Sequence, residues 1–333
     1  MSVATVSRYL QGNNVRAATR IRQAIEELAF HPKPAARSLK SGVTYSVAVV
    51  VPDISNPYFA AVVKGVESIS RQGDYNIFLY NTEEDGQREA AILADLRGRV
   101  DGVILTPADE SPEAEERLVA AGMPVVLLDR EFGNGGGFDS VVIDNAGGAA
   151  QAARYLCALG HTKIGLISGP LDTMPGRTRH DSFLAVLAAD GIEMPASHVV
   201  LSTFREEGGY QATLRLLALQ VPPTAIFATN NLMCIGALHA LHDMRVSPPG
   251  EISVIGFDDL DLAELLNPPL TVISRPMEEQ GALALRLLLN RLTGGSTRHR
   301  RIELDTRLVI RESCAAPVAG HPDPPNTRKA THA

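Results

Sequence analysis

The first residues of the chain combine a short amphipathic pattern with arginines, which suits contact with a polyanion. The pattern from Ser2 to Leu10 predicts a short helix with small and polar side chains on its exposed side. Such a side can lie in the major groove of DNA, while Val6 and Leu10 face a partner helix. We expect Ser2 to cap this helix, because a serine hydroxyl accepts a hydrogen bond from an N–H group of the first turn.

A second amphipathic helix is predicted from about Ala17 to Ala29, with Thr19 as a possible cap. Its apolar residues follow the spacing i, i+4, i+7, at Ile21, Ile25 and Leu28.

Residues 1–44 hold seven basic and two acidic side chains, a net charge of +5, whereas the whole chain carries −7. A basic head on an acidic body fits polyanion binding by the head alone. The alternative is a short arm that is basic by chance.

Length and composition restrict the class of protein. A chain of 333 residues can bury a large core, and its hydrophobic content of 45% is typical of a globular protein. No apolar run reaches membrane-spanning length, and residues 1–30 are too charged for a secretory signal, which predicts a cytoplasmic protein. The three cysteines are far apart and form no CxxC pair, so they indicate neither a disulfide framework nor a zinc site.

From Tyr45 onward, short runs rich in β-branched residues alternate with longer amphipathic stretches, the pattern of a parallel sheet covered by helices. The predicted strands are Ser46–Val51, Asn76–Tyr80, Gly102–Thr106, Val125–Leu128, Ser140–Ile143, Lys163–Ser168, Val199–Ser202, Thr224–Ala228, Ile252–Gly256, Leu270–Ser274 and Arg301–Leu304. The predicted helices are Tyr58–Arg71, Arg88–Leu96, Ala146–Leu159, Arg177–Ala189, Gly208–Leu219, Leu232–Met244 and Met277–Leu292. So many strands exceed one ordinary sheet. We therefore expect an α/β fold of two doubly wound parallel-sheet subdomains, followed by a proline-rich disordered tail over 313–333.

Polar and aromatic residues follow several of these strands, and ligands of open α/β sheets bind at the carboxyl ends of the strands. The residues in question are Tyr58, Phe59, Asp129, Arg130, Asp144, Thr173, Arg179, Phe204, Asn230 and Asp258. Aromatic rings can cover the C–H face of a polyhydroxylated ligand, while acidic, amide and guanidinium groups satisfy its hydroxyls. We expect Arg179 and Asp258 to reach this cleft from opposite subdomains. Two alternatives stay open: Asp144 and Asp258 as helix caps, and the two phenylalanines as core.

Short motifs recur in a fixed order along nearly the whole chain. They are Ser2–Arg8, Phe30–Pro32, Ala36–Leu39, Pro52–Phe59, Val100–Ile104, Val142–Asn145, Gly160–His161, Ile167–Pro170, Arg179 with Phe183, and Val254–Asp258. With these motifs in this order and at this spacing, the chain strongly resembles the lactose/galactose-repressor (LacI/GalR) family of bacterial transcription factors. The set is specific, although any single motif would be weak.

The resemblance implies a helix-turn-helix head over 1–44, with a hinge helix at about 34–41 that folds on the operator. It also implies a periplasmic-binding-protein-like body over 45–312 that binds a small effector and dimerises. The expected partners are double-stranded, near-palindromic operator DNA and a second copy of the chain. Two residues depart from the family pattern, Lys33 where asparagine is frequent and Asn231 where aspartate is frequent. The first helix of the helix-turn-helix is missing, and we expect in-frame codons upstream of Met1 to encode it.

By the resemblance, the helix from Ser2 to Leu10 is the recognition helix, and its first residues face base edges. Val3 and Ala4 occupy the positions that discriminate operators, while Thr5 and Ser7 suit phosphate contacts.

Arg8 can donate two hydrogen bonds to guanine O6 and N7, worth about 1–3 kcal/mol of discrimination, unless it is a solvated surface arginine. In the hinge, we expect Leu39 to wedge into the minor groove and kink the duplex, with Ala36 and Arg37 beside it on the DNA. The alternative is that Leu39 packs on its own subunit.

Five of the strand-end residues match positions that line the effector pocket in the family: Phe59, Asp144, Arg179, Phe204 and Asp258. A sugar or sugar derivative is favoured over a purine, because Thr173 stands where the purine repressor has an arginine for a base oxygen. The resemblance implies a repressor without a cofactor. Whether the effector induces or co-represses stays open.

Three other functions can be compared with this one. An enzyme on such a body finds little support, because the chain has no GxxxxGK[ST], HExxH or GxSxG motif, and Gly133–Gly137 lacks the GxGxxG spacing. His239 and His242 have no third ligand nearby in sequence, so no metal site is predicted. The basic head argues against a periplasmic transport receptor. A truncated regulator that only binds its ligand stays open because of the missing helix.

Overall fold

The computed structural model describes residues 2–10, 14–28, 42–73, 75–133, 137–295 and 298–318. The head contains the two predicted helices, α1 (Val3–Leu10) and α2 (Ala18–Glu27), and Ile21 of α2 is buried. The hydroxyl of Ser2 accepts a hydrogen bond from the N–H of Thr5 at 3.3 Å, which confirms the predicted cap. Helix α2 begins after Ala17 without a side-chain cap, so the expectation for Thr19 was wrong. The predicted hinge at 34–41 lies outside the described residues.

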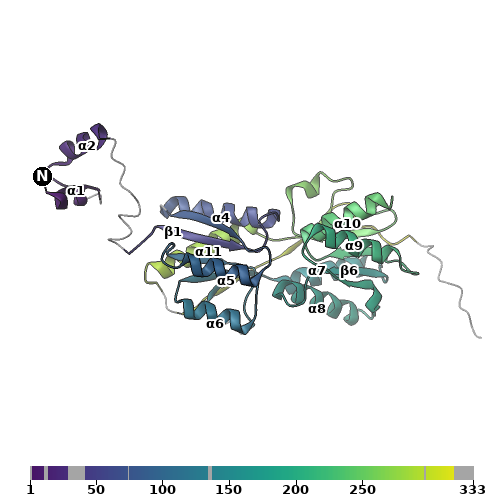
Figure 1. Cartoon of the computed structure of the whole chain (residues 1–333). Coiled ribbons are helices and arrows are strands. Elements are labelled where there is room, and N and C mark those ends of the chain that lie inside the picture. The colour runs from purple at the N-terminus through teal and green to yellow at the C-terminus, as the bar shows by residue number, and fades with distance from the viewer. Residues whose placement is uncertain are drawn as a thin grey trace, which may run out of the picture.

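The body has two six-stranded sheets, and every strand predicted from the sequence is present (Figure 1). The first sheet has the order β11-β5-β4-β3-β1-β2, with all neighbours parallel. Its strands are β1 (Ser46–Val51), β2 (Asn76–Asn81), β3 (Gly102–Leu105), β4 (Val125–Leu128), β5 (Asp139–Ile143) and β11 (Arg301–Leu304). Strand β1 is buried along its whole length, which is typical of a central parallel strand covered on both faces.

The second sheet has the order β12-β10-β9-β8-β6-β7. Its strands are β6 (Ile164–Ser168), β7 (Val199–Leu201), β8 (Ala225–Ala228), β9 (Ser253–Phe257), β10 (Thr271–Ser274) and β12 (Arg307–Val309). Strand β12 was not predicted, and it pairs antiparallel with β10 at the sheet edge. The expectation of two doubly wound parallel-sheet subdomains is confirmed, with this antiparallel edge as the exception.

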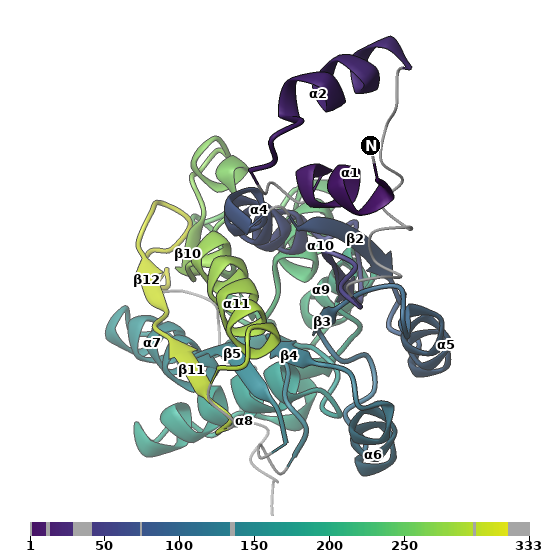
Figure 2. The same cartoon turned by 90° about the vertical axis from the view of Figure 1, so that its left-hand side faces the viewer.

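Helices cover both faces of each sheet (Figure 2). In the first subdomain, α4 (Pro57–Gly73) and α11 (Met277–Leu292) pack on one face, and α5 (Gly86–Leu96) and α6 (Pro112–Ala121) pack on the other. In the second, α7 (Asn145–Ala158) and α8 (Met174–Ala189) lie opposite α9 (Glu206–Leu217) and α10 (Asn231–Asp243). Helix α6 was not predicted. Short 3₁₀ turns at Ala196–His198 and Asp261–Glu264 complete the described secondary structure.

Helices α4 and α11 cross at a pair of glycines. A Cβ atom on Gly65 would lie 1.9 Å from the carbonyl oxygen of Glu278, and one on Gly281 would lie 2.0 Å from that of Val62. Only glycine allows the two backbones to approach this closely. The crossing fixes the start of α4, which carries Tyr58, against the segment that leads into α11.

The chain passes between the two subdomains three times. It crosses after β5 at Asp144, again between β10 and α11 at Arg275 and Pro276, and a third time between β11 and β12 at Asp305 and Thr306. Three connections of this kind allow the subdomains to rotate relative to each other while they remain joined.

The predicted tail begins too early. The hydroxyl of Ser313 donates to the carbonyl of Val254 at 2.6 Å and accepts from the N–H of Thr271 at 2.8 Å, and its side chain is buried. The carbonyl of Ala315 also contacts the ring of His161 at 2.9 Å. Ser313 and Ala315 therefore pack on the second subdomain, so the tail begins after them rather than at 313, whereas Val318 is exposed. Residues 319–333 lie outside the described part.

Candidate functional site

A small cavity lies between the subdomains where the carboxyl ends of the strands of the two sheets meet. Its volume is about 30 Å³. It is lined by Asp53, Asn56, Tyr58, Phe59, Glu84, Asp129, Arg130, Pro175, Arg179, Phe204, Asn230 and Arg275. A space of this size has room for a water molecule or two rather than for an organic ligand. The subdomains are therefore closed on each other around this point.

Arg275 occupies the centre of this closed arrangement. One Nη donates to Asp129, which follows β4 in the first subdomain, and the other donates to Asp258, which follows β9 in the second, at 3.1 Å. The guanidinium carbon lies 3.5 Å from the centre of the Tyr58 ring, a cation–π distance. Burial alone would lower the pKa of Arg275, but the charges of Asp258 and Asp129 raise it overall. Arg275 thus remains cationic and joins the two subdomains.

Both aspartates that hold Arg275 have strained backbones. The φ angles of Asp129 and Asp258 are +65° and +79°, in the left-handed region that favours glycine. A non-glycine residue in this region costs of the order of 1–3 kcal/mol and persists only where its surroundings require it. The same strained geometry therefore turns one carboxylate from each sheet toward the cleft.

Arg179 of α8 is fully buried, but no carboxylate among the described residues pairs with it directly. Its Nε donates to the side-chain oxygen of Asn145 and its Nη1 to the carbonyl of Thr229, each at 2.7 Å. The guanidinium carbon lies 3.6 Å from the centre of the Phe257 ring. Burial, together with the charge of Arg275, lowers the pKa of Arg179 to about 10. Within the described part of the chain, its Nη2 has no hydrogen-bond partner.

Arg130 forms a third polar group at the cavity. It makes a two-point ion pair with Glu84, with both N–O distances at 2.7 Å, and also donates to the carbonyl of Pro107 at 3.0 Å. Its guanidinium carbon lies 5.7 Å from the centre of the Phe204 ring, which belongs to the second subdomain. Its Nε is buried and has no hydrogen-bond partner among the described residues. Arg130 therefore holds an unused donor at the cavity wall.

Two asparagines connect the subdomains directly. The side-chain nitrogen of Asn231 donates to the side-chain oxygen of Asn56 at 2.8 Å, and both residues are buried. Asn56 also accepts from the N–H of Tyr58 at 2.9 Å at the start of α4. Asn230, which lines the cavity, caps α10 by accepting from the N–H of Met233.

Most of the strand-end residues singled out in the sequence lie together here. The cavity lining includes Tyr58, Phe59, Asp129, Arg130, Arg179, Phe204 and Asn230. Asp258 is not among the lining residues, but it accepts a hydrogen bond from Arg275, which is. The expectation that Arg179 and Asp258 approach from opposite subdomains was wrong, since both belong to the second.

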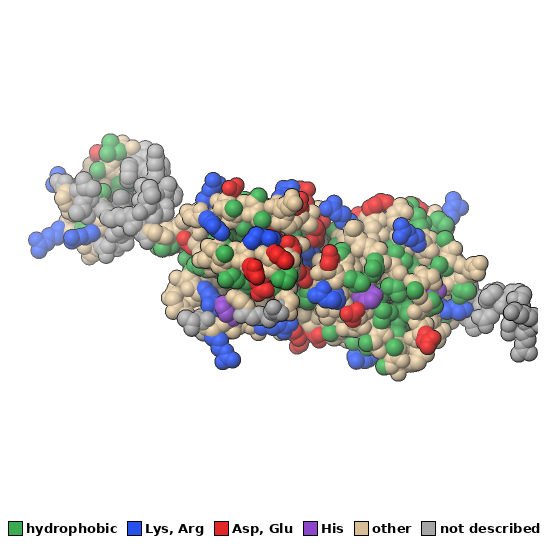
Figure 3. Space-filling model, turned by 60° about the horizontal axis from the view of Figure 1, so that its bottom comes forward, with side chains coloured by type: hydrophobic (Ala, Val, Ile, Leu, Met, Phe, Trp, Pro, Cys, Tyr) green, Lys and Arg blue, Asp and Glu red, His purple; other side chains and the backbone are tan. Residues whose placement is uncertain are grey.

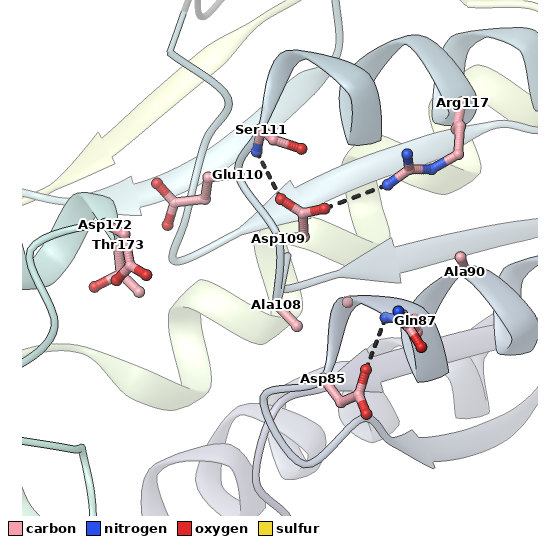
Figure 4. Close-up of a pocket in the computed structure, with 11 residues that line it drawn as sticks. Asp85, Gln87, Ala90, Ala108, Asp109, Glu110, Ser111, Arg117, Asp172 and Thr173 are labelled. Carbon is pink, nitrogen blue, oxygen red and sulfur yellow. Dashed lines mark hydrogen bonds and ion pairs between the residues drawn. The ribbon is translucent and has the colours of Figure 1, made fainter.

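Two predicted residues lie elsewhere. The carboxylate of Asp144 accepts from the N–H of Gly147 at 2.7 Å and caps α7, as the alternative held, and it is not part of the cavity lining. Thr173 caps α8 and lines an outer groove of about 860 Å³ that opens to solvent between the subdomains (Figure 4). This groove is polar, with Asp85, Asp109 and Glu110 on its walls.

The sequence interpretation missed five residues of the cavity lining: Asp53, Asn56, Glu84, Pro175 and Arg275. A signal for Arg275 was present, because it directly follows the predicted strand Leu270–Ser274 and so stands at a carboxyl end like the others. No group of three or more histidine, cysteine or acidic side chains in the described ranges is placed to hold a metal ion.

The described part of the head exposes four arginines, Arg8, Arg16, Arg20 and Arg22. Basic side chains project from the head at the left of Figure 3, whereas acidic and basic side chains are interspersed over the visible face of the body. The predicted DNA contacts of Ala36, Arg37 and Leu39, and the side chains of Val3, Ala4 and Ser7, lie outside what the structure describes. Among the described residues, no helix combines the length and the apolar character needed to cross a bilayer.

Comparisons with known proteins agree with this architecture. The family model of the periplasmic binding protein-like domain matches residues 153–314. The chain is 34% identical to the ribose operon repressor of Escherichia coli K12 over 88% of this chain and 89% of the relative, and 32% identical to catabolite control protein A of Priestia megaterium over 94% and 96%. A LacI family transcriptional regulator from Enterococcus faecium, solved with bound ribose, superposes with a TM-score of 0.72 at 31% identity, over 81% of this chain and 99% of that one.

The similarity to catabolite control protein A extends over nearly the whole chain, and the solved regulator shares the fold. These relatives are named as a repressor, a control protein and a transcriptional regulator, so the chain is a DNA-binding transcriptional regulator. It therefore belongs to the LacI/GalR family.

Proposed function

We propose that this regulator is a repressor whose effector is a sugar of the size of a pentose, bound in the cavity between the subdomains. The observation that carries the proposal is the pair of unused donors, Arg130 Nε and Arg179 Nη2, on residues that line a cavity with aromatic walls. Sugar hydroxyl oxygens would satisfy these donors, and the relative with bound ribose supports the ligand class.

The remaining groups fit the same ligand. The rings of Tyr58 and Phe59, which meet edge to face with centroids 4.7 Å apart, and the ring of Phe204 supply apolar surface for the C–H face of a sugar. The carboxylates of Asp129 and Asp258 would accept its hydroxyls. Because Arg275 now holds both carboxylates and the cavity is small, the sugar must be admitted by opening of the subdomains about the three crossings.

The same motion would reach the DNA-binding head through the start of the body. One carboxylate oxygen of Asp101 accepts from the N–H of Thr44 at 2.7 Å and from its hydroxyl at 2.9 Å, and the other accepts from the N–H of Tyr45 at 2.8 Å. These hydrogen bonds hold Thr44 and Tyr45, which follow the predicted hinge helix, against the first sheet. Movement of the first subdomain would then displace the paired hinges, with a coupling free energy of typically 1–3 kcal/mol.

On DNA, the proposed contacts are those of the recognition helix and the hinge. Ser2, Val3, Ala4, Thr5, Ser7 and Arg8 would face the major groove and its phosphates, and Ala36, Arg37 and Leu39 the minor groove. The regulator would act in the cytoplasm, and no enzymatic activity is expected of it.

The test is a gel shift of the full chain on its own upstream DNA, with D-ribose titrated into the complex. We expect specific binding to a near-palindromic site and a change in operator affinity of about 5- to 150-fold at saturating sugar. Calorimetry with D-ribose measures the binding step separately. Sugar binding without any operator binding would favour the truncated ligand-binding protein instead.

An apolar loop supports the proposed homodimer. Leu262, Leu265 and Leu266, between β9 and β10, are 65%, 78% and 39% exposed. Arg311 holds this loop in place, since it pairs at two points with Asp259 and also contacts Glu264. A cluster of exposed leucines on an ordered loop is typical of a surface that a partner covers.

Replacing Leu265 with aspartate should therefore dissociate the dimer, because a charge would be buried at the centre of an apolar contact. We expect an increase of at least about tenfold in the dimer dissociation constant, measured by sedimentation equilibrium. Val119→Asp is the matched control, since Val119 is 58% exposed on α6. If Leu265→Asp sediments like the wild-type protein and like the control, this loop is not the dimer surface.

A further inference from the structure

Glu110 reaches across the mouth of the cleft from one subdomain to the other. It lies in the loop between β3 and α6, and Figure 4 shows its side chain directed away from Asp109 toward the loop that carries Asp172 and Thr173. Both carboxylate oxygens accept from the N–H of Met174, at 2.9 and 2.8 Å. Its side chain is only 8% exposed. A first-subdomain carboxylate is therefore buried against a second-subdomain helix.

The N–H of Met174 lies at the start of a helix, where no side chain of the same loop accepts a hydrogen bond from it. Met174 is the first residue of α8, and the first N–H groups of a helix have no partner within the helix. The hydroxyl of Thr173, the local cap, serves Gly176 instead, at 3.3 Å. Glu110 thus completes the cap of α8 from the opposite subdomain. The helix dipole stabilises an ionised carboxylate at this end, but burial opposes the charge more strongly.

This contact is separate from the contacts at the effector cavity. Glu110 lines the outer groove and is absent from the residues that line the inner cavity. It holds α8, the same helix that presents Arg179 to the cavity. Opening of the subdomains must break the contact, whatever ligand is bound inside.

We propose that Glu110 is a positioning residue that latches the closed cleft by capping α8 from the opposite subdomain. A latch made by a buried carboxyl group also makes closure depend on pH. The proposal concerns the motion of the two subdomains and does not depend on which effector is bound.

The charges around Glu110 set the direction of that dependence. From the second subdomain it faces Arg177, with a nitrogen at 4.0 Å, and Asp172 of the preceding loop; from the first it faces Arg130, Asp129 and its neighbour Asp109. Burial raises the pKa of Glu110 to about 7, against the lowering effects of the Met174 N–H and the two arginines.

In the open form the carboxylate returns to water, where its pKa is about 4.3. The closed form therefore binds the proton more tightly, so a fall in pH favours closure and a rise in pH through 7 favours opening. Between pH 6 and pH 8 the opening constant should rise by about tenfold.

Hydrogen exchange of the full chain without ligand tests the latch. A peptide over residues 171–176 reports the Met174 amide, and its exchange, corrected for the intrinsic rate at each pH, gives the opening constant. We expect Glu110→Ala to speed this exchange by about tenfold or more at pH 7. Glu113→Ala, an exposed glutamate on the first turn of α6, should leave it unchanged.

Two further variants separate the latch from a general structural effect. Glu110→Gln keeps an acceptor oxygen but cannot titrate, so it should retain protection while losing the tenfold pH dependence. Glu89→Gln tests the other buried glutamate nearby, whose pKa burial also raises to about 7 but which bonds to Ala108 within its own subdomain. We expect Glu89→Gln to keep the wild-type pH dependence. Equal exchange in wild type and Glu110→Ala, or a pH dependence that survives in Glu110→Gln, overturns the proposal.

Discussion

Replacement of Arg275 by methionine is expected to reduce the free energy of unfolding by about 3–5 kcal/mol. The substitution keeps much of the side-chain volume but leaves Asp129 and Asp258 buried with no cation between them. Removal of one partner from a buried ionic group costs far more than the group contributes in net stability, because the remaining charges stay desolvated. Urea denaturation followed by far-UV circular dichroism measures the change.

Two comparisons make this result specific to the buried cluster. Arg301→Met removes a surface arginine that is 48% exposed and pairs with Glu131 and Glu303, and should cost no more than about 1 kcal/mol. The triple variant Asp129→Asn, Asp258→Asn and Arg275→Met removes all the charges and should recover part of the lost stability. Equal losses in Arg275→Met and Arg301→Met would show that the central arginine carries no special electrostatic role.

Arg179→Ala is expected to remove the response to the effector, with a decrease in D-ribose affinity of about 10- to 150-fold. The change deletes the unused donor and also leaves the buried acceptors of Asn145 and Thr229 without their partner. Calorimetry of the full chain with D-ribose measures affinity, and operator affinity without sugar should remain within about tenfold of wild type.

Arg154→Ala is the matched control for this substitution, because Arg154 is exposed on α7 of the same subdomain. Arg179→Lys should behave like the alanine variant, since an ammonium group cannot donate at three separate positions in a plane. Undiminished ribose binding by Arg179→Ala would contradict the assignment of this arginine to the effector site.

The sheets were predictable because their central strands are short runs of β-branched residues buried on both faces. The central strands Ser46–Val51 and Val125–Leu128 were predicted with the bounds that the structure has, and so was the edge strand Arg301–Leu304. Helix α6 was missed because it buries only Ala114 and Leu118, too few for a clear helical period, although Ser111 and Pro112 signal its start. Strand β12 was missed because three residues, one of them an exposed arginine, carry little pattern.

The site was only partly predictable. The rule that ligands bind at the carboxyl ends of strands identified most of the residues that line the cavity. However, the same position also precedes each helix, so a polar residue there either caps the helix or faces the cleft. The pattern of the sequence does not distinguish Asp144, which caps α7, from Asp129, which faces Arg275. Nor does it state which strands share a sheet, and this explains why Arg179 and Asp258 were assigned to opposite subdomains.

The three crossings between the subdomains have a consequence for synthesis on the ribosome. The first subdomain lacks α11 and β11 until residue 304 has been translated, and the second lacks β12 and the buried Ser313 until a few residues later. Neither half can complete its core as an independent N-terminal unit, although domains of multidomain chains generally fold in that order. The basic head therefore emerges long before the body can fold. A nascent regulator would carry a DNA-binding segment without the folded body that controls it, and regulated activity would begin only after the last strands are in place.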